Sequence, residues 1–215
     1  MTEPELALTH RYRRGTADDG VTVLLLHGTG GDETDLLGVG ETIAPGRAFL
    51  SPRGAVEESG LPRFFRRLAA GVFEQEDLRA RTAELADFLL AAAARYDFDP
   101  SRIVAAGYSN GANIAASLLL RDPGALAGAC LFRPMVPFEP DPSPLTLKPP
   151  LDGIPVLLAA GRRDPTVLPN DTERLATLLR SDGADVELHW SPEGHDLDAT
   201  DLAAARTWLT THFPL

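Results

Sequence analysis

Residues 107–111, Gly-Tyr-Ser-Asn-Gly, have the residue types and spacing of a serine nucleophile held at a sharp turn. The apolar run 103–106 precedes this segment and the apolar stretch 112–120 follows it, as expected for a strand that turns directly into a helix. Such a turn strains the backbone of the serine, and side chains two positions before and after it would collide. Glycine at both ends meets that requirement, so we predict that Ser109 is a nucleophile.

A carboxylate and a histidine that could activate this serine follow it in the sequence. A serine hydroxyl is a weak nucleophile until a base takes its proton, and the partners of a serine at such a turn come in the order Asp or Glu, then His. Asp164 follows the apolar run 154–160, and His195 follows the run 185–190. Because the carboxyl ends of parallel strands share one edge of a sheet, Ser109, Asp164 and His195 can converge there as a catalytic triad.

Each member of this triad also has a simpler interpretation. Ser109 could be an ordinary turn residue, and Asp164, which precedes a proline, could start a turn or cap a helix. His195 could be a solvated loop histidine. Asp196 or Asp198 could take the place of the carboxylate or could be helix N-caps instead. The occurrence of the three residue types in the required order favours the triad over these alternatives.

Residues 27–33, His-Gly-Thr-Gly-Gly-Asp-Glu, form a glycine-rich segment directly after the apolar run 21–26. Acyl transfer builds negative charge on a carbonyl oxygen, and backbone N–H groups aimed at that oxygen stabilise it. We expect the N–H groups of Thr29 and Asn110, the residue after the nucleophile, to form this oxyanion hole. The segment lacks the G-x-x-x-x-G-K-[ST] pattern and the third glycine of G-x-G-x-x-G, which disfavours phosphate or dinucleotide binding.

No metal and no cofactor is expected from the sequence. Four potential metal ligands gather in one segment: His27, Asp32, Glu33 and Asp35. Their spacing matches none of the usual metal-ligand patterns, and the carboxylates are better explained as caps of a helix that starts near Asp35. The single cysteine, Cys130, cannot form an intrachain disulfide.

Apolar side chains in or beside the loops at the predicted edge could contact a substrate. The substrate-binding candidates are Phe64, Phe65, Met135, Val136 and Val167, with Phe132, Phe138 and Leu168 in or beside the same loops. They favour an ester with a small to medium apolar or aromatic acyl group, although each of them could equally belong to the core.

Apolar β-branched runs alternate with longer amphipathic stretches along the chain, which predicts an α/β fold with a mostly parallel sheet and helices on both faces. The predicted strands are 21–27, 47–51, 102–107, 127–132, 154–160 and 185–190, with a short outer strand around 10–14. The predicted helices are 76–96, 111–121, 171–181 and 197–212. The stretch 133–155 contains eight prolines, which predicts a long ordered excursion that could be a lid, a binding wall or a plain linker.

The chain length of 215 residues suits a single domain, 1–215, that can bury a sizeable core without disulfides or a metal. The net charge of −11 disfavours nucleic acid and anionic lipid as partners, and no apolar run is long enough for membrane insertion. The start of the sequence lacks the basic and apolar regions of a signal peptide, so we expect a cytoplasmic protein. The sequence leaves open whether the chain forms a homodimer.

Several segments of the sequence also match the motifs of a known family. They are Leu-His-Gly-Thr-Gly-Gly-Asp-Glu at 26–33, Ser-Pro-Arg-Gly at 51–54, Gly-Tyr-Ser-Asn-Gly-Ala at 107–112, Gly-Arg-Arg-Asp-Pro at 161–165 and Glu-Gly-His at 193–195. With them the chain resembles the phospholipase/carboxylesterase branch of the α/β-hydrolase superfamily, from about residue 21 to the last residue. The Pro-Arg-Gly segment and Arg-Pro-Met-Val-Pro at 133–137 look most like the predicted hydrolases associated with resistance to hydroquinones.

This resemblance implies an α/β-hydrolase fold, the same triad and the same pair of oxyanion-hole amides. One departure is Asn110, since family members often carry Gln after the nucleophile. Together with the residues, the resemblance predicts a cofactor-independent serine hydrolase that cleaves a small-molecule carboxylic ester through an acyl-enzyme. A thioesterase or a lysophospholipase with the same triad is the nearest alternative. A non-catalytic binding protein is another, because fold alone does not establish function.

Overall fold

A seven-stranded sheet forms the centre of the protein. The structure is a computed structural model that describes residues 6–138 and 150–215 of the chain. The strand order is β1-β3-β2-β8-β9-β10-β11, and all neighbours are parallel except β1, which pairs antiparallel with β3. The strands are β1 (His10–Arg13), β2 (Thr22–Leu26), β3 (Ala48–Pro52), β8 (Ile103–Tyr108), β9 (Gly128–Phe132), β10 (Pro155–Gly161) and β11 (Asp185–Ser191). Each predicted strand is confirmed, and no end differs from the prediction by more than one residue.

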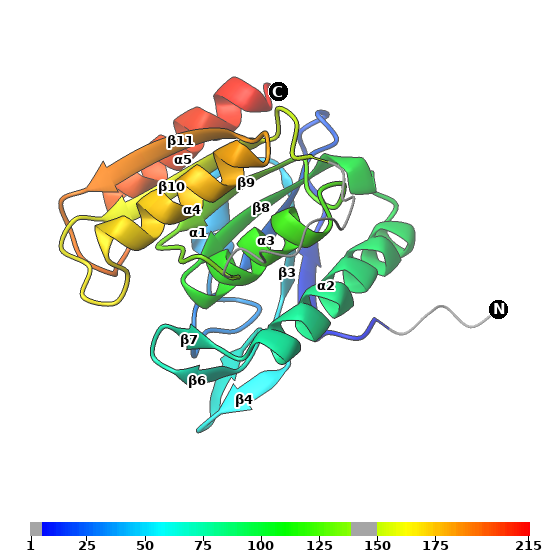
Figure 1. Ribbon diagram of the computed structural model, residues 1–215. Coiled ribbons are helices and arrows are strands. Elements are labelled where there is room, and N and C mark those ends of the chain that lie inside the picture. The colour runs from blue at the N-terminus through cyan, green and yellow to red at the C-terminus, as the bar shows by residue number, and fades with distance from the viewer. Residues whose placement is uncertain (1–5, 139–149) are drawn as a thin grey trace.

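Helices cover both faces of this sheet, which confirms the predicted α/β class (Figure 1). One face carries α2 (Gln75–Tyr96), α3 (Asn110–Arg121) and α4 (Pro169–Ser181), and the other carries α1 (Leu37–Ile43) and α5 (Ala199–His212). A short 3-10 helix, Pro100–Arg102, leads into β8. The four predicted helices correspond to α2, α3, α4 and α5 and end at the predicted residues. Within residues 6–138 and 150–215, none of the helices combines the length and apolar character needed to span a bilayer.

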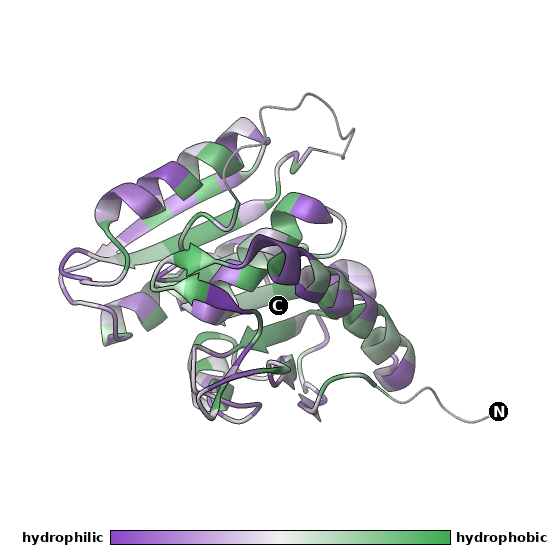
Figure 2. Cartoon of the chain, turned by 60° about the horizontal axis from the view of Figure 1, so that its bottom comes forward, coloured by the Kyte–Doolittle hydropathy of each residue, from purple (hydrophilic) through white to green (hydrophobic). Residues whose placement is uncertain are grey.

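The inner strands are buried because their side chains are almost all apolar. Every residue of β2 and β9 is buried, and Figure 2 shows green strands between helices whose outer sides are largely purple. Parallel strands that are covered on both faces are expected to be continuously apolar. Because β2, β8, β9, β10 and β11 run in the same direction, their carboxyl ends lie along one edge of the sheet, and the loops that leave this edge carry the predicted site.

Two antiparallel hairpins between β3 and α2 are absent from the sequence-based prediction. They are formed by β4 (Val56–Glu58) with β5 (Leu61–Arg63) and by β6 (Arg67–Ala69) with β7 (Val72–Phe73). Strands of two or three residues are too short to show the alternation that marks a strand in a sequence. In the first turn, Ser59 and Gly60 have positive φ angles of 53° and 80°, as tight hairpin turns require. The hairpin also reaches the glycine-rich segment, since the Gly30 N–H donates to the Pro62 carbonyl at 2.9 Å.

The proline-rich stretch 133–155 is described only in part, because residues 139–149 lie outside the described ranges. Its first part is joined to α3 by a hydrogen bond of 2.7 Å from the Met135 N–H to Asn113 Oδ1. Its last part is joined to the end of α4 by a hydrogen bond of 2.8 Å from the Leu151 N–H to the Asp182 carbonyl. The lid or binding wall that the prolines predict stays a prediction.

Candidate active site

Ser109 lies at the tight turn between β8 and α3, where the glycine pattern predicts it. Its backbone has φ 52° and ψ −109°, and a positive φ is unusual for a residue other than glycine. A Cβ atom added at Gly107 would lie 2.6 Å from the Gly111 carbonyl oxygen, and one added at Gly111 would lie 2.0 Å from the Leu26 carbonyl oxygen. Both distances are well inside van der Waals contact, so only glycine fits on either side. The Ser109 N–H donates to the Phe132 carbonyl at 2.9 Å, which holds the turn against β9.

His195 joins the serine to the aspartate. It lies in the loop between β11 and α5, with its Nε2 atom 3.0 Å from Ser109 Oγ and its Nδ1 atom 2.7 Å from Asp164 Oδ2. The Tyr108 hydroxyl donates to the His195 carbonyl at 3.2 Å. Burial raises the pKa of Tyr108 to about 12, so the phenol keeps the proton that this hydrogen bond needs. The three residues predicted as a triad therefore form one continuous hydrogen-bonded series.

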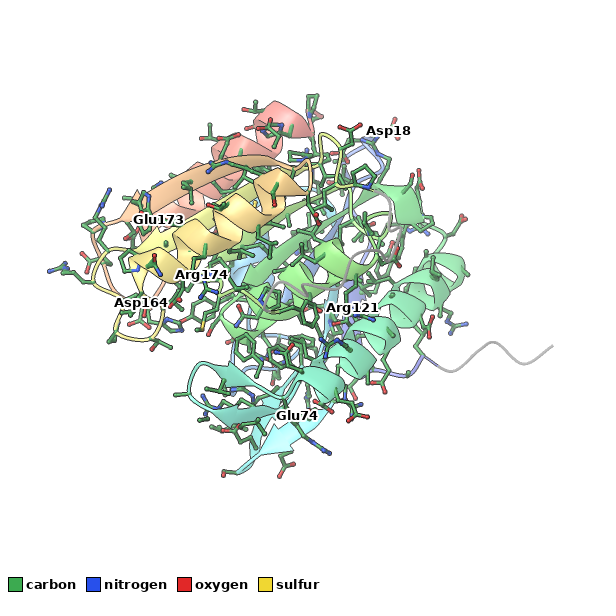
Figure 3. The ribbon with its side chains drawn as sticks, viewed as in Figure 1. Asp18, Glu74, Arg121, Asp164, Glu173 and Arg174 are labelled. Atoms are coloured by element: carbon green, nitrogen blue, oxygen red, sulfur yellow. The ribbon has the colours of Figure 1, made fainter. Side chains whose placement is uncertain are left out.

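Asp164 lies in the loop between β10 and α4, as Figure 3 shows. Only 4% of the residue is exposed, and the Oδ1 atom accepts hydrogen bonds from the N–H groups of Thr166 at 2.7 Å and Val167 at 3.0 Å. These two donors fix the plane of the carboxylate and leave Oδ2 for His195. The sequence suggested, as an alternative, that Asp164 starts a turn. It does so, and the hydrogen bonds of this turn orient its carboxylate toward His195.

The two alternative carboxylates are engaged in other ways. Asp198 is the N-cap of α5 and accepts hydrogen bonds from the N–H groups of Thr200 at 2.6 Å and Asp201 at 3.1 Å. Hydrogen bonds from the Ser191 hydroxyl and from Thr200 lower the pKa of Asp198. The backbone carbonyl of Asp196 accepts a hydrogen bond of 2.7 Å from Arg133. The N-cap interpretation therefore describes Asp198, while Asp164 is the carboxylate bound to the histidine.

The two predicted oxyanion donors lie on the loop after β2 and at the start of α3. Within the described residues, the N–H groups of Thr29 and Asn110 have no hydrogen-bond acceptor, and Asn110 is the first residue of its helix, where N–H groups lack an intrahelical partner. The Thr29 hydroxyl accepts a hydrogen bond of 2.6 Å from Arg63 Nη1. Arg63 is only 3% exposed, and this burial lowers the pKa of its guanidinium. No sequence motif points to Arg63, because its role depends on the unpredicted first hairpin.

The side chain of Asn110 faces the same hairpin. Its Oδ1 atom accepts a hydrogen bond of 2.7 Å from the Phe64 N–H, while its Nδ2 atom is buried without a partner in the described part of the chain. The amide side chain of Asn110 therefore connects the start of α3 to the segment that follows β5. This contact gives Asn110 a structural task that is separate from that of its backbone N–H.

Most of the chain matches one family of known proteins. The sequence profile described as Phospholipase/Carboxylesterase matches residues 14–213. The chain belongs to the phospholipase/carboxylesterase family. This carboxylesterase is 45% identical to the MhqD protein of Bacillus subtilis (strain 168) over 205 residues, which cover 94% of this chain and 97% of MhqD.

Solved structures agree with this assignment. The crystal structure of the Bacillus cereus carboxylesterase is 45% identical and covers 96% of this chain and 95% of its own, with a TM-score of 0.92. A carboxylesterase from Mesorhizobium loti is 36% identical over 96% of each chain, with a TM-score of 0.88. The family and the α/β-hydrolase fold implied by the sequence motifs are confirmed.

Two of the potential metal ligands of this carboxylesterase, His27 and Glu33, are bound to protein groups. His27 Nδ1 lies 2.6 Å from the Gly28 carbonyl oxygen, and Nε2 accepts a hydrogen bond of 3.0 Å from the Gly54 N–H. Burial lowers the pKa of His27, which favours the neutral ring that this arrangement needs. Glu33 forms a bidentate ion pair with Arg53 at 2.5 Å and 3.0 Å. Glu33 and the histidine therefore tie the glycine-rich segment to the loop after β3.

The predicted helix cap in this segment is wrong. Helix α1 begins at Leu37, its N-cap is Leu36, and no side chain caps it by a hydrogen bond. Asp32 instead accepts a hydrogen bond of 2.7 Å from the Thr34 N–H, which closes a turn before the helix. The sequence predicts a cap because Asp near a helix start commonly fills that position. In the structure, Asp32 instead closes the turn and Glu33 pairs with Arg53.

The five substrate-binding candidates of this carboxylesterase differ in how much surface they expose. Phe64 is 3% exposed and Phe65 is 0% exposed, and both belong to the core cluster that includes α2. Val167 is 3% exposed, and its N–H binds Asp164. Met135 and Val136 are half-buried. These last two are therefore the candidates with the most exposed surface, whereas Phe64 and Phe65 are part of the core.

Proposed function

We propose that this carboxylesterase hydrolyses carboxylic esters by covalent catalysis at Ser109, with His195 as the general base and Asp164 as the group that orients it. One observation carries the proposal. Hydrogen bonds of 3.0 Å and 2.7 Å join the Ser109 hydroxyl, both ring nitrogens of His195 and the Asp164 carboxylate in series. A general base must lie within hydrogen-bond reach of the proton it takes, and His195 does so.

In the first half of the reaction, Ser109 Oγ attacks the ester carbonyl while His195 Nε2 takes the hydroxyl proton. The bond from the carbonyl carbon to the alcohol oxygen then breaks, and the imidazolium gives its proton to the leaving alkoxide. In the second half, water gives a proton to Nε2 and attacks the acyl-enzyme, and the proton returns to Ser109 as the carboxylic acid leaves. Asp164 stabilises the imidazolium in both halves, because Oδ2 accepts a hydrogen bond from the Nδ1–H group and the carboxylate stays ionised.

The tetrahedral intermediate places a negative charge on the former carbonyl oxygen. The N–H groups of Thr29 and Asn110 are the proposed donors to it, and both lack an acceptor within the described residues. A fixed donor needs no reorganisation when the charge develops, so it stabilises the transition state more than water does. The Arg63 bond to the Thr29 hydroxyl supports this arrangement, because it restrains the residue whose N–H must stay in place.

The proposed substrate is an ester with a small to medium apolar or aromatic acyl group. The half-buried side chains of Met135 and Val136 support an apolar acyl group. Two structural neighbours are carboxylesterases, which favours an oxygen ester over a thioester. Matched oxygen esters and thioesters of one acyl group, compared by kcat/KM, would test this preference. A higher kcat/KM for the thioester would support a thioesterase instead.

The Ser109→Ala variant tests the nucleophile. We expect it to lose both hydrolysis of a p-nitrophenyl short-chain ester and labelling by a fluorophosphonate probe, while circular dichroism shows an unchanged fold. Ser181→Ala is a matched control, because Ser181 is exposed at the end of α4. Full labelling of the Ser109→Ala protein would mean that another residue is the nucleophile.

A further inference from the structure

Arg133 is a buried arginine that the proposed reaction does not use. It directly follows β9, has a positive φ of 55° and is 0% exposed. Its backbone N–H donates to the Ala159 carbonyl at 2.7 Å, which joins it to β10. Arginine is rarely buried unless its charge is paired, and a positive φ is costly for a side chain of this size. Such a placement requires specific partners for the guanidinium.

The guanidinium of Arg133 binds the backbone on both sides of His195. Its Nε atom donates to the Gly194 carbonyl at 2.9 Å, and its Nη2 atom donates to the Asp196 carbonyl at 2.7 Å. The carbonyl of His195 itself accepts the hydrogen bond from Tyr108. Three consecutive carbonyls, at residues 194 to 196, are therefore held by two side chains, one from the last residue of β8 and one from the residue after β9.

The opposite side of the guanidinium is held by α5. Asp201 accepts from Nη1 at 3.0 Å and from Nη2 at 2.7 Å, and both side chains of this pair are 0% exposed. Asp201 Oδ2 also accepts from the Asp198 N–H at 3.1 Å, which completes the capping box of the helix. Nη1 makes one more bond, of 3.2 Å, to the Ala159 carbonyl. All five N–H groups of the guanidinium can thus donate a hydrogen bond. The carboxylate of Asp201, in the first turn of α5, fixes the plane of the guanidinium.

We propose that Arg133 is a positioning residue that sets the place of His195 between the nucleophile and the carboxylate. The proposal rests on the proposed role of His195. Bonds to the carbonyls on both sides of one residue restrain the position of its Cα atom and the direction of its side chain. Lysine cannot replace this arrangement, because a single ammonium group cannot reach two carbonyls and a bidentate carboxylate in one plane.

A buried ion pair elsewhere in the fold provides a matched control. Arg47 and Asp19 are joined at 2.7 Å with 3% of each side chain exposed, and Arg47 also donates to the Phe213 carbonyl. Arg47 precedes β3, at the edge of the sheet opposite to the proposed site. Its replacement perturbs a buried arginine with a carboxylate and a carbonyl partner, but it leaves the loop of His195 untouched.

The experiment compares Arg133→Lys with Arg47→Lys. We expect both variants to unfold at lower temperature, while only Arg133→Lys loses kcat, by about 10²-fold, because small misplacement of a catalytic group costs that much. KM should stay unchanged, since both halves of the reaction use His195 and slow together. The downfield proton resonance of the hydrogen bond between His195 and Asp164 should weaken in Arg133→Lys alone. A wild-type kcat in folded Arg133→Lys, or an equal loss in Arg47→Lys, would overturn the proposal.

A second variant covers the case in which Arg133→Lys does not fold. The double variant Arg133→Met with Asp201→Leu removes both buried charges together, and such replacements often keep the fold. The positioning role predicts a folded protein with the same loss of kcat, whereas wild-type kcat would refute it. The His195→Ala variant distinguishes a failure of the proposed function from a failure of the proposed role of Arg133. An active His195→Ala protein would refute the proposed function, whereas an inactive one beside a fully active Arg133 variant would refute only the role of Arg133.

Discussion

Replacement of Asp164 by asparagine should leave the protein folded but place the proton of His195 on the wrong nitrogen. Asp164 Oδ1 accepts two backbone N–H groups, from Thr166 and Val167. In Asp164→Asn the amide oxygen must stay with these donors, since a flip would leave buried groups unpaired at about 1–3 kcal/mol each. The amide NH2 then faces His195 Nδ1 and donates to it. The histidine therefore carries its proton on Nε2, where it cannot accept the proton of Ser109.

The size of the effect follows from this forced tautomer. The same replacement in an established triad lowers kcat by about 10⁴-fold, which corresponds to about 5 kcal/mol in activation free energy. Here the two backbone donors to Oδ1 hold the amide in the unfavourable orientation, so we expect a loss of that order. Substrate binding should persist, because Asp164 is buried behind the histidine and is only 4% exposed.

Steady-state hydrolysis of a p-nitrophenyl short-chain ester gives kcat and KM for this comparison. Asp198→Asn is the matched control, because it makes the same change at the N-cap of α5. We expect the control to lose stability and to keep most of its kcat. If Asp198→Asn lost about four orders of magnitude and Asp164→Asn did not, the assignment of the carboxylate would be refuted.

Two further predictions concern the glycine-rich segment. Thr29→Pro should lower kcat by about 10²- to 10³-fold because it deletes a proposed oxyanion donor, whereas Thr29→Ala should mainly lower stability, by about 1–3 kcal/mol, because Nη1 of the buried Arg63 loses the hydroxyl that accepts its hydrogen bond. Equal kcat values for the two variants, with circular dichroism showing both folded, would contradict a backbone donor. Burial lowers the pKa of His27 in the folded protein, so the unfolded chain binds a proton more readily and the free energy of unfolding should fall as pH falls below about 6.5. Urea titrations at several pH values should show a smaller fall in the free energy of unfolding for His27→Gln than for the wild type. The same pH dependence in both proteins would show that His27 does not cause the loss of stability at low pH.

The sequence predicts those features of this protein that depend on local pattern. The sheet strands were predicted to within one residue because the inner ones are continuously apolar and thus distinct from their surroundings. The position of Ser109 was predicted because its turn admits only glycine on both sides. The two hairpins after β3 were missed, since each strand has too few residues to show a period. Locally encoded elements were therefore predictable, whereas elements defined by their partners were not.

The surroundings of the site depend on residues that are distant in sequence. The sequence shows Arg133 only as part of a family motif and does not predict its contacts. Its partners on α5 and in the loop of His195 come together only in the folded chain. The same is true of Arg63 and the hydroxyl of Thr29. Burial also separates the predicted substrate residues, since Phe65 is 0% exposed while Met135 is half-buried. Sequence periodicity gives no information on such contacts.

The strand order has a consequence for the sequence of events in folding. The strands β1, β3, β2, β8 and β9 are adjacent in the sheet and come from the first part of the chain, and the segments that directly follow β2 and β8 carry the proposed nucleophile and both proposed oxyanion donors. β10 and β11 come later in the chain and extend the sheet from β9, and the loops that follow them carry Asp164 and His195. The proposed nucleophile is thus attached to the part of the sheet that comes first in the chain, whereas the proposed base is attached to the part that comes last. During refolding, the rate at which the protein gains reactivity toward a fluorophosphonate probe would therefore report the rate at which β10 and β11 join the sheet. A chain still bound to the ribosome would gain this reactivity only once β11 and the loop after it have left the ribosome.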